Sequence, residues 1–243
     1  MLLISLALAA DPISWDHFPL QPARPDAQAL GPDWMMVGPQ GPLIYDAVDH
    51  QLYTLTGQHM TVPMADDGLI LPDQSILLRN DRQVWWLDQT GELRAQMALP
   101  DLVPPGPLKL VGTMLYVEDV FLNLHPAFTL SAHRLIPATD PTLRPNPLPV
   151  QRAGLALSVG GKQMAQCQQR CGGYLVGDWL IVEEHGAQSI VRYGIHTATH
   201  QRVELSVGPR LYAPSRDLAV GPDGHLWWMQ ATTSGLIVEE ISP

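Results

Sequence analysis

Asp217-Leu-Ala-Val-Gly-Pro-Asp-Gly-His-Leu-Trp-Trp-Met229 places a tight turn between two short apolar runs. Gly, Pro and Asp supply the backbone conformations that a tight hairpin turn needs. The runs on either side are too short for helices and are rich in branched and aromatic residues, so they read as strands. The segment therefore predicts two antiparallel strands joined by the turn at Gly221 to Gly224.

The same pattern recurs four times earlier in the chain, in weaker form. Its turns are Gly38-Pro-Gln-Gly41, Pro72-Asp73, Gly112 and Gly177-Asp178, and the runs that follow them include Leu43-Ile-Tyr45, Met114-Leu-Tyr-Val117 and Trp179-Leu-Ile-Val182. One small sheet cannot bury both of its faces, but sheets stacked around an axis can. The repeats therefore predict an all-β fold, a β-propeller, with a sandwich of two antiparallel sheets as the alternative.

The spacing of the turns predicts five blades, with six as the alternative. A blade usually takes about 40 residues, and the interval from Gly112 to Asp178 is much longer than the others. This interval holds either one blade with a long insertion or an additional, obscured blade. The last repeat has three clear strands, so we expect a strand within Ile13 to Leu20 to close the last blade.

Composition limits the classes of partner. The 243 residues include 14 Lys and Arg against 24 Asp and Glu, for a net charge of −10. Nucleic acids and anionic membranes need a basic surface, so neither is expected as a partner. With 23 Pro and 20 Gly, the chain is a poor former of long helices, and the best helical candidate is the short stretch 161–170.

The first ten residues resemble a secretory signal, because an apolar run ends in Ala7-x-Ala9. The remainder, 11–243, is expected to be one domain with an irregular, Pro- and Gly-rich insertion at about 137–173. Cys167 and Cys171 lie inside that insertion, and a close pair in an exported protein is expected to form a disulfide, whereas in the cytosol it would be two free thiols or half of a metal site. We therefore predict a periplasmic or extracellular protein without an integral membrane segment after removal of the signal.

Carboxylates follow the second run of several repeats at similar offsets. These residues are Asp46, Glu118, Asp119, Glu183 and Glu184. In a propeller they would reach one face around the central channel, where oxygen ligands can hold Ca²⁺ or Mg²⁺. The competing interpretation is that they cap turns and face solvent, so they are binding candidates only, and no cofactor is predicted outright.

Two other patterns fit ordinary structural roles. His196 and His200 have the spacing of a ligand pair on a helix, but their strand and turn context indicates the end of a hairpin. The pairs Trp85-Trp86 and Trp227-Trp228 are interpreted as core residues of equivalent strands. No nucleophile elbow, phosphate loop, dinucleotide fingerprint or zincin helix occurs in the sequence, so the catalytic residues stay unknown.

The segment Gly221-Pro-Asp-Gly-His-Leu-Trp-Trp228 resembles the repeat of the virginiamycin B lyase and NHL-type propellers. The resemblance implies how the blade is built, and it implies little about activity. The lyase family works with His, Glu and a divalent cation, but the repeat places none of those residues in this chain.

Two hypotheses of function follow. The first is an exported, non-enzymatic β-propeller that serves as a binding or scaffold module for a protein, peptide or envelope component. The second is a metal-assisted lyase or hydrolase with its site in the central channel, built from the acids at 46, 118–119 and 183–184. A cluster of acids and histidines around a cation would favour the enzyme, and an apolar face rimmed by loops would favour the binding module.

Overall fold

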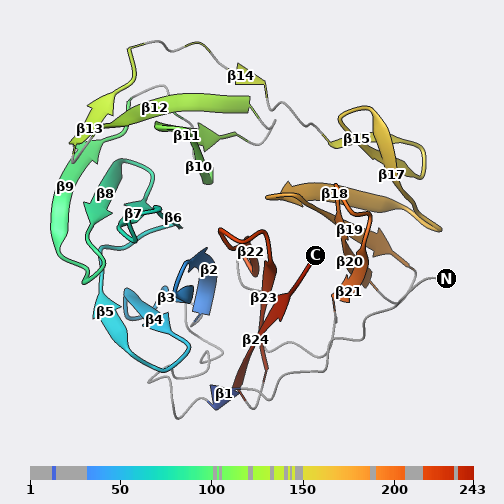
Figure 1. Cartoon of the computed structure of the whole chain (residues 1–243), viewed down its shortest axis with the longest axis horizontal. Coiled ribbons are helices and arrows are strands. Elements are labelled where there is room, and N and C mark those ends of the chain that lie inside the picture. The colour runs from blue at the N-terminus through green and yellow to red at the C-terminus, as the bar shows by residue number, and fades with distance from the viewer. Residues whose placement is uncertain are drawn as a thin grey trace. The chain divides into compact units, whose positions relative to one another are not determined.

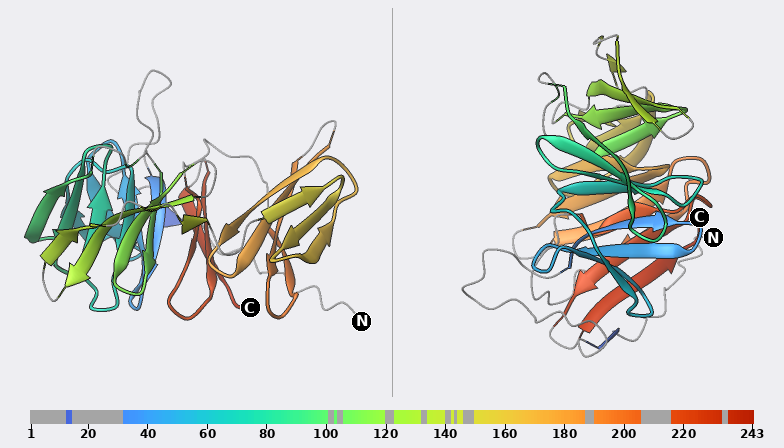
Figure 2. Two further views of the ribbon diagram at one scale, coloured as in Figure 1. Left: turned by 90° about the horizontal axis from the view of Figure 1, so that it is seen from above. Right: turned by 90° about the vertical axis from the view of Figure 1, so that its left-hand side faces the viewer.

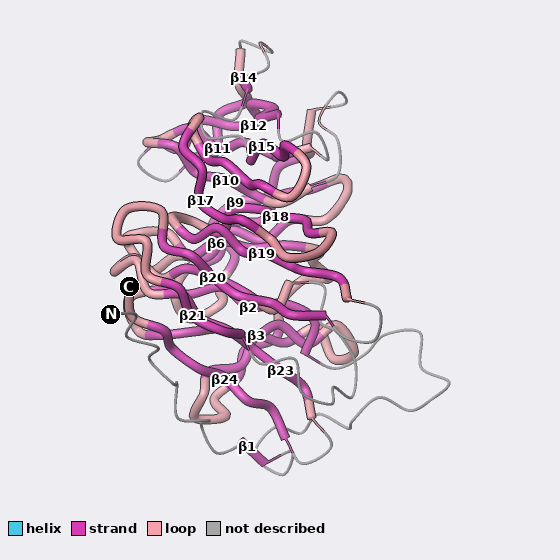
Figure 3. The backbone as a smooth tube through the Cα atoms, turned by 90° about the vertical axis from the view of Figure 1, so that its right-hand side faces the viewer, coloured by secondary structure: helices cyan, strands magenta, loops and turns pink. Residues whose placement is uncertain are grey.

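The described part of the chain consists of strands and turns. The computed structural model describes residues 13–14, 32–100, 103, 106–119, 123–131, 134–139, 142, 144–145, 150–186, 190–205, 216–232 and 235–243. Figure 3 traces these residues as strands and loops, with no helix among them. None of the described residues therefore forms a helix that spans a bilayer. The predicted signal segment lies outside them.

The contacts divide the chain into two compact units, one of residues 36–146 and one of residues 1–35 with 147–243. The first sheet, whose strand β2 crosses the boundary, contains β2 (Pro32–Gly38), β3 (Gly41–Asp46), β4 (Gln51–Thr54) and β5 (His59–Thr61). The second contains β6 (Asp67–Ile70), β7 (Ile76–Arg79), β8 (Gln83–Leu87) and β9 (Leu93–Ala98). The third contains β10 (Leu108–Val111), β11 (Met114–Glu118), β12 (Asn123–Ser131), β13 (Arg134–Pro137) and β14 (Arg144–Pro145).

The other unit also holds three sheets. They are β15 (Val150–Ala153), β16 (Ala156–Val159) and β17 (Lys162–Gln166); β18 (Cys171–Val176), β19 (Trp179–His185), β20 (Ile190–His196) and β21 (Arg202–Leu205); and β22 (Leu218–Val220), β23 (Leu226–Ala231), β24 (Gly235–Ile241) and β1 (Ile13–Ser14). In all six sheets, each strand after the first pairs antiparallel with the strand before it. The exceptions are β1, which pairs with β24, and β14, which pairs with β12. Figure 1 shows these strands coloured in chain order, and β16 lies between the labelled β15 and β17 in sequence.

The turns follow the chemistry that the sequence predicts. Gly224 adopts a φ of 83°, a conformation that favours glycine, and Gly221 donates its N–H to the carbonyl of His225 at 2.9 Å. The Asp223 carboxylate accepts the N–H of His225 at 3.1 Å. A side-chain cap and a glycine thus close the hairpin between β22 and β23, as the first quoted segment requires.

Apolar faces of neighbouring sheets pack against each other within each unit. Leu77 and Trp86 of one sheet share a buried cluster with Leu115 and Phe128 of the next. In the other unit, one cluster joins the sheets β15–β17 and β18–β21, and another joins β18–β21 to β22–β24. The first strands also lie side by side, β6 beside β10 and β18 beside β22. This stacking of small meander sheets is the organisation of β-propeller blades.

The all-β propeller fold predicted from the repeats is confirmed, and so is the closing strand. β1 pairs antiparallel with β24, with Ile13 opposite Leu236 and Ser14 opposite Gly235. The described residues form six sheets, and the number of blades in a closed ring stays a prediction. The long interval after Gly112 contains the additional sheet β15–β17 (gold in Figure 2), which is one of the two arrangements left open for it.

Two sequence interpretations were wrong in detail. The stretch 161–170 is not helical, because it forms β17 and the loop that follows. The Trp pairs are not in equivalent strands, since Trp85 and Trp86 lie in the third strand of their sheet and Trp227 and Trp228 in the second of theirs. The equivalent features are the turns at Asp73 and Asp223, each of which joins the first and second strands of its sheet. Three of the four indoles are buried as core residues, and Trp227 is partly exposed.

Candidate functional site: a polar hollow beside the disulfide

The five predicted acids lie at equivalent places in their own sheets, at or near the C-terminal end of the second strand. Asp46 ends β3, Glu118 ends β11 with Asp119 next to it, and Glu183 and Glu184 lie near the end of β19. The similar offsets seen in the sequence therefore reflect equivalent positions in the sheets. What distinguishes the acids is the set of partners that each one has.

Asp46 is fully buried, and its Oδ1 accepts the N–H of Val48 at 2.8 Å. Its Oδ2 has no hydrogen-bond partner. Burial raises the pKa of Asp46, although the hydrogen bond from Val48 opposes the shift. The same buried carboxylate adds to the effect of burial on Tyr53, whose pKa rises to about 12.

Glu118 and Asp119 are held by residues of their own sheet. Glu118 forms an ion pair with Lys109 at 3.3 Å. Asp119 lies 2.9 Å from Nε2 of His125 and accepts the N–H of Asn123 at 2.8 Å. These contacts tie β10 and β12 to the end of β11, so both carboxylates have a structural role.

Glu183 belongs to a buried charge network that sequence reasoning missed. Arg192 donates to both oxygens of Asp217, at 2.5 and 3.0 Å, and also bonds the hydroxyl of Tyr174. Its Nε lies 3.2 Å from Glu183. Burial alone would lower the pKa of Arg192, but the hydrogen bonds and charge of Asp217 outweigh it and raise that pKa. The available signal was an arginine inside an apolar strand and an aspartate directly before the run 218–220.

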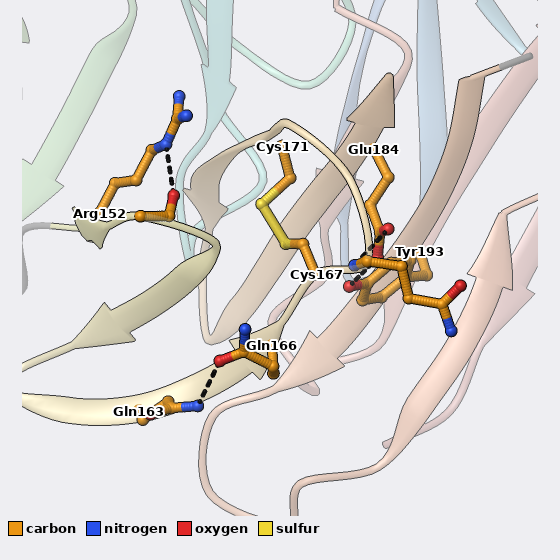
Figure 4. Close-up of a disulfide and its surroundings, with 9 residues drawn as sticks. Arg152, Gln163, Gln166, Cys167, Cys171, Glu184 and Tyr193 are labelled. Atoms are coloured by element: carbon orange, nitrogen blue, oxygen red, sulfur yellow. Dashed lines mark hydrogen bonds between the residues drawn. A yellow bond between two sulfur atoms is a disulfide. The ribbon is translucent and has the colours of Figure 1, made fainter. Parts of the chain in front are cut away.

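Glu184 helps to form a polar hollow. Its carboxylate accepts the hydroxyl of Tyr193 at 2.9 Å and the backbone N–H of Gln168 at 3.1 Å. Burial and then the hydrogen bond to Glu184 raise the pKa of Tyr193 to about 12. The guanidinium of Arg202 stacks 3.7 Å from the centre of the Tyr193 ring. Figure 4 shows Glu184 and Tyr193 beside the disulfide.

Cys167 and Cys171 are joined by a disulfide, both sulfurs being buried in the cluster between two sheets. The bond closes the loop that connects β17 to β18. Gln168 and Gln169 lie inside that loop, so the covalent link fixes the backbone that presents them. The disulfide is therefore part of the framework of the hollow.

The hollow has a volume of about 160 Å³ and a mixed lining. It is lined by Gln166, Gln168, Gln169, Glu184, Gly186, Val191 and Arg202. Three amides, a carboxylate and a guanidinium supply both donors and acceptors in a small space. Val191, which lines the hollow, and its neighbour Ile190 are exposed apolar residues. Such a site can hold the polar end or a side chain of a larger ligand.

The sheet before the disulfide has an open edge. Among the described residues, β17 pairs with β16 alone, so the sheet has three strands where the others have four or five. From Val150 to Gly177 the charged residues are Arg152, Lys162 and Arg170, with no Asp or Glu. All three are exposed. A basic surface with an open strand edge thus leads into the hollow at Gln166.

The histidine pair flanks the turn between β20 and β21, as its context predicts, because His196 ends β20 and His200 follows the turn. His200 donates its N–H to the carbonyl of His196 at 2.9 Å, and Nδ1 of His196 contacts Thr199. Within the described ranges, a close group of three potential metal ligands is found elsewhere, at Asp223, His225 and Glu240. The turn sequence alone did not indicate it, because Glu240 comes from a different strand.

No protein-family model and no curated protein matches the chain. Among solved structures, it is similar to BamB from Moraxella catarrhalis, with a TM-score of 0.38 and 12% identity over 96% of this chain and 97% of that one. It is also similar to a streptogramin B lyase, with a TM-score of 0.38 and 15% identity over 90% of this chain and 71% of that one. A third similarity is to the AfRom2 CNH domain, with a TM-score of 0.39 and 9% identity over 92% and 86%. Similarities at this level carry no argument about activity or partners.

Proposed function

We propose that the protein is an exported binding module that takes up an extended, acidic segment of a partner protein along β17. The observation that carries the proposal is the sheet β15–β17, in which the described residues form three strands. A strand edge with unpaired N–H and C=O groups is a template on which another extended chain can form a fourth strand. Main-chain hydrogen bonds would supply affinity in this mode, and nearby side chains would supply specificity.

The charge of the partner follows from the charge of the sheet. The chain as a whole carries −10, yet the stretch around this sheet carries only Arg152, Lys162 and Arg170 as charged residues. An acidic segment would be attracted to this stretch and repelled by most of the remaining surface. Such complementarity affects the choice of partner and the association rate more than raw affinity.

The hollow gives the bound segment a defined end. A strand laid along β17 reaches Gln166, which belongs both to that strand and to the lining of the hollow. Amides and the Arg202 guanidinium can hydrogen-bond a polar side chain there, while Val191 offers apolar contact. We expect this end to determine which segments bind well.

Export is the second part of the proposal, and the disulfide supports it. Disulfides persist in oxidising compartments and are rare in the cytosol of mesophiles. The bond between Cys167 and Cys171 also holds the loop of the hollow, so an oxidising compartment would keep the binding site intact. Cell fractionation with thiol labelling tests this part, and a reduced, cytosolic protein would contradict it.

The metal-assisted lyase or hydrolase is the less favoured hypothesis. The acids on which it rests have protein partners, among them Lys109 for Glu118, His125 for Asp119 and Tyr193 for Glu184. A carboxylate engaged in such contacts must give them up, at least in part, to bind Ca²⁺ or Mg²⁺. The open edge and the hollow require no such rearrangement.

A labelled peptide of alternating threonine and glutamate tests the binding function by fluorescence anisotropy on the full chain. We expect saturable binding that weakens as salt is added. Lys162→Glu and Arg170→Glu should each weaken it about fivefold, or about 1 kcal/mol. Arg134→Glu, in the outer strand β13 of another sheet, is the matched control and should have no effect.

The probe itself separates strand addition from simple charge attraction. Methylation of alternate backbone nitrogens leaves the charge of the peptide intact and removes the donors that a β-ladder needs. The methylated peptide should therefore not bind. Equal binding of both peptides, or an equal loss in Arg134→Glu, would show that the peptide does not add to β17.

A further inference from the structure

Three metal-ligating side chains converge on the hairpin that identifies the fold. Nδ1 of His225 lies 2.7 Å from Oε1 of Glu240 and 3.5 Å from Oδ2 of Asp223. One ligand atom from each residue lies within 4.8 Å of the others. Asp223 and Glu240 are exposed and His225 is half-buried, so an ion from solvent can reach the group.

These separations are close to those of ligands around one small cation. Ligand atoms about 2.1 Å from a tetrahedral zinc ion lie about 3.4 Å apart, by the geometry of the tetrahedron. The contact of 3.5 Å already matches this value, and the contact of 2.7 Å requires a small outward rotation of one side chain. The same imidazole nitrogen faces both carboxylates, so it is the ligand atom.

The sheet β6–β9 offers an internal comparison, because its first turn is built in the same way. There Asp73 accepts the N–H of Ser75 at 3.1 Å, as Asp223 accepts that of His225. In both turns the aspartate accepts the backbone N–H of the residue two positions later, a contact that serine makes at 75 as histidine does at 225. A histidine at 225 is not required to close the hairpin.

The comparison extends to the third ligand. Glu240 occupies the register position that Trp86 holds in the third strand of the other sheet. Trp86 donates its indole N–H to Oγ of Ser75 at 2.8 Å, which gives a neutral, buried contact. At the corresponding place, the imidazole of His225 contacts the carboxylate of Glu240, and solvent can reach both of these groups. The repeat therefore folds without the pair, and the pair adds metal-binding chemistry to the framework.

We propose that Asp223, His225 and Glu240 bind a divalent transition-metal ion of the zinc class. One imidazole and two carboxylates suit such an ion, whereas Ca²⁺ takes six to eight oxygen ligands. The site is preorganised, because Trp179 donates its indole N–H to the carbonyl of Gly224 at 3.0 Å and holds the turn. Three protein ligands leave a coordination position open for water or for a group of a partner. The site lies on a different sheet from β17, so the two proposals stand or fall separately.

Isothermal titration of the full, metal-free chain with zinc chloride tests the site. We expect one saturable site that His225→Ser and Glu240→Gln each weaken by at least about 10- to 100-fold, which is the loss found when only a hydrogen-bond partner of a metal ligand is removed. Serine is the residue at the equivalent position of the other sheet, so the first variant should stay folded, and thermal melting checks this. His200→Ser removes an exposed histidine outside the site and should leave the affinity unchanged.

Two outcomes would overturn the proposal. One is the absence of saturable binding to the unaltered chain. The other is an affinity that folded His225→Ser and Glu240→Gln retain, or that His200→Ser loses to the same extent, because either would place the ion elsewhere.

Discussion

Replacing Asp217 with asparagine removes the negative charge that faces Arg192 inside the protein. Both side chains are nearly inaccessible, at 5% for Arg192 and 10% for Asp217. The substitution keeps the shape and one acceptor oxygen. The cost of a buried charge that loses its partner is about 3–5 kcal/mol.

The low end of that range applies here, because Arg192 keeps the contacts to Glu183 and Tyr174. We therefore expect Asp217→Asn to reduce the free energy of unfolding by about 3 kcal/mol. For a chain of this size, such a loss lowers Tm by about 6–12 °C. Thermal and urea denaturation, followed by circular dichroism, measure both quantities.

Glu183→Gln is the matched control, since it removes a carboxylate from the same guanidinium at a position that is 36% exposed. Solvent screens this pair, so the cost should be about 1 kcal/mol or less. Replacing both Arg192 and Asp217 with apolar residues of similar size should recover part of the lost stability. If Asp217→Asn costs no more than Glu183→Gln, the network is not a buried charge pair of the kind described.

Three further predictions concern pH and redox state. Burial raises the pKa of Asp46 above 3.8, so wild-type stability falls as pH rises through the window between the unfolded and folded pKa values. Asp46→Asn should therefore gain stability relative to wild type as the pH is raised above the unfolded pKa of 3.8, and an unchanged stability difference across that rise would contradict this. Tyr193 should titrate near pH 12 by absorbance difference against Tyr193→Phe, and Glu184→Gln should lower that pKa; an unchanged value would mean that Glu184 does not contribute. Replacing Cys167 and Cys171 with serine should cost about 2 kcal/mol, because the bond closes a small loop, and should also weaken peptide binding at the hollow; intact binding would separate the loop from the site.

The parts of the fold that the sequence predicts best are those where local chemistry acts alone. The turn at Asp223 is determined by an aspartate cap and a glycine, both of which can be read from one short segment. The strands that follow such turns are short, apolar and bounded, so their existence is also predictable. The pairing of β1 with β24 was inferred from an incomplete last repeat, which is a rule of architecture rather than of local sequence.

The candidate sites depend on pairings between strands, which a single repeat does not reveal. His225 and Glu240 meet because β23 and β24 pair in a particular register, and a shift by one residue would send Glu240 to the opposite face. Arg192 finds Asp217 because two sheets stack. The five predicted acids follow the second apolar run of their repeats at similar offsets, and they do occupy equivalent strand ends. Their partners, however, come from strands that this offset does not identify.

The sequence allows the sheet β15–β17 only as an obscured additional blade and predicts none of its strands, for a physical reason that also bears on the proposed function. Strands buried on both faces read as apolar runs, but Lys162-Gln-Met-Ala-Gln166 has only one buried residue, and its sequence predicts part of a short helix at 161–170. A strand that stays polar suits the outer edge of a sheet, where charges and glutamines discourage unspecific pairing. Among the described residues, the other sheets have a fourth strand beyond the position that β17 occupies in this sheet, and this sheet has none there. A polar edge is compatible with water, which accounts for the irregular sequence, and under the proposed function the same edge would take up an acidic strand.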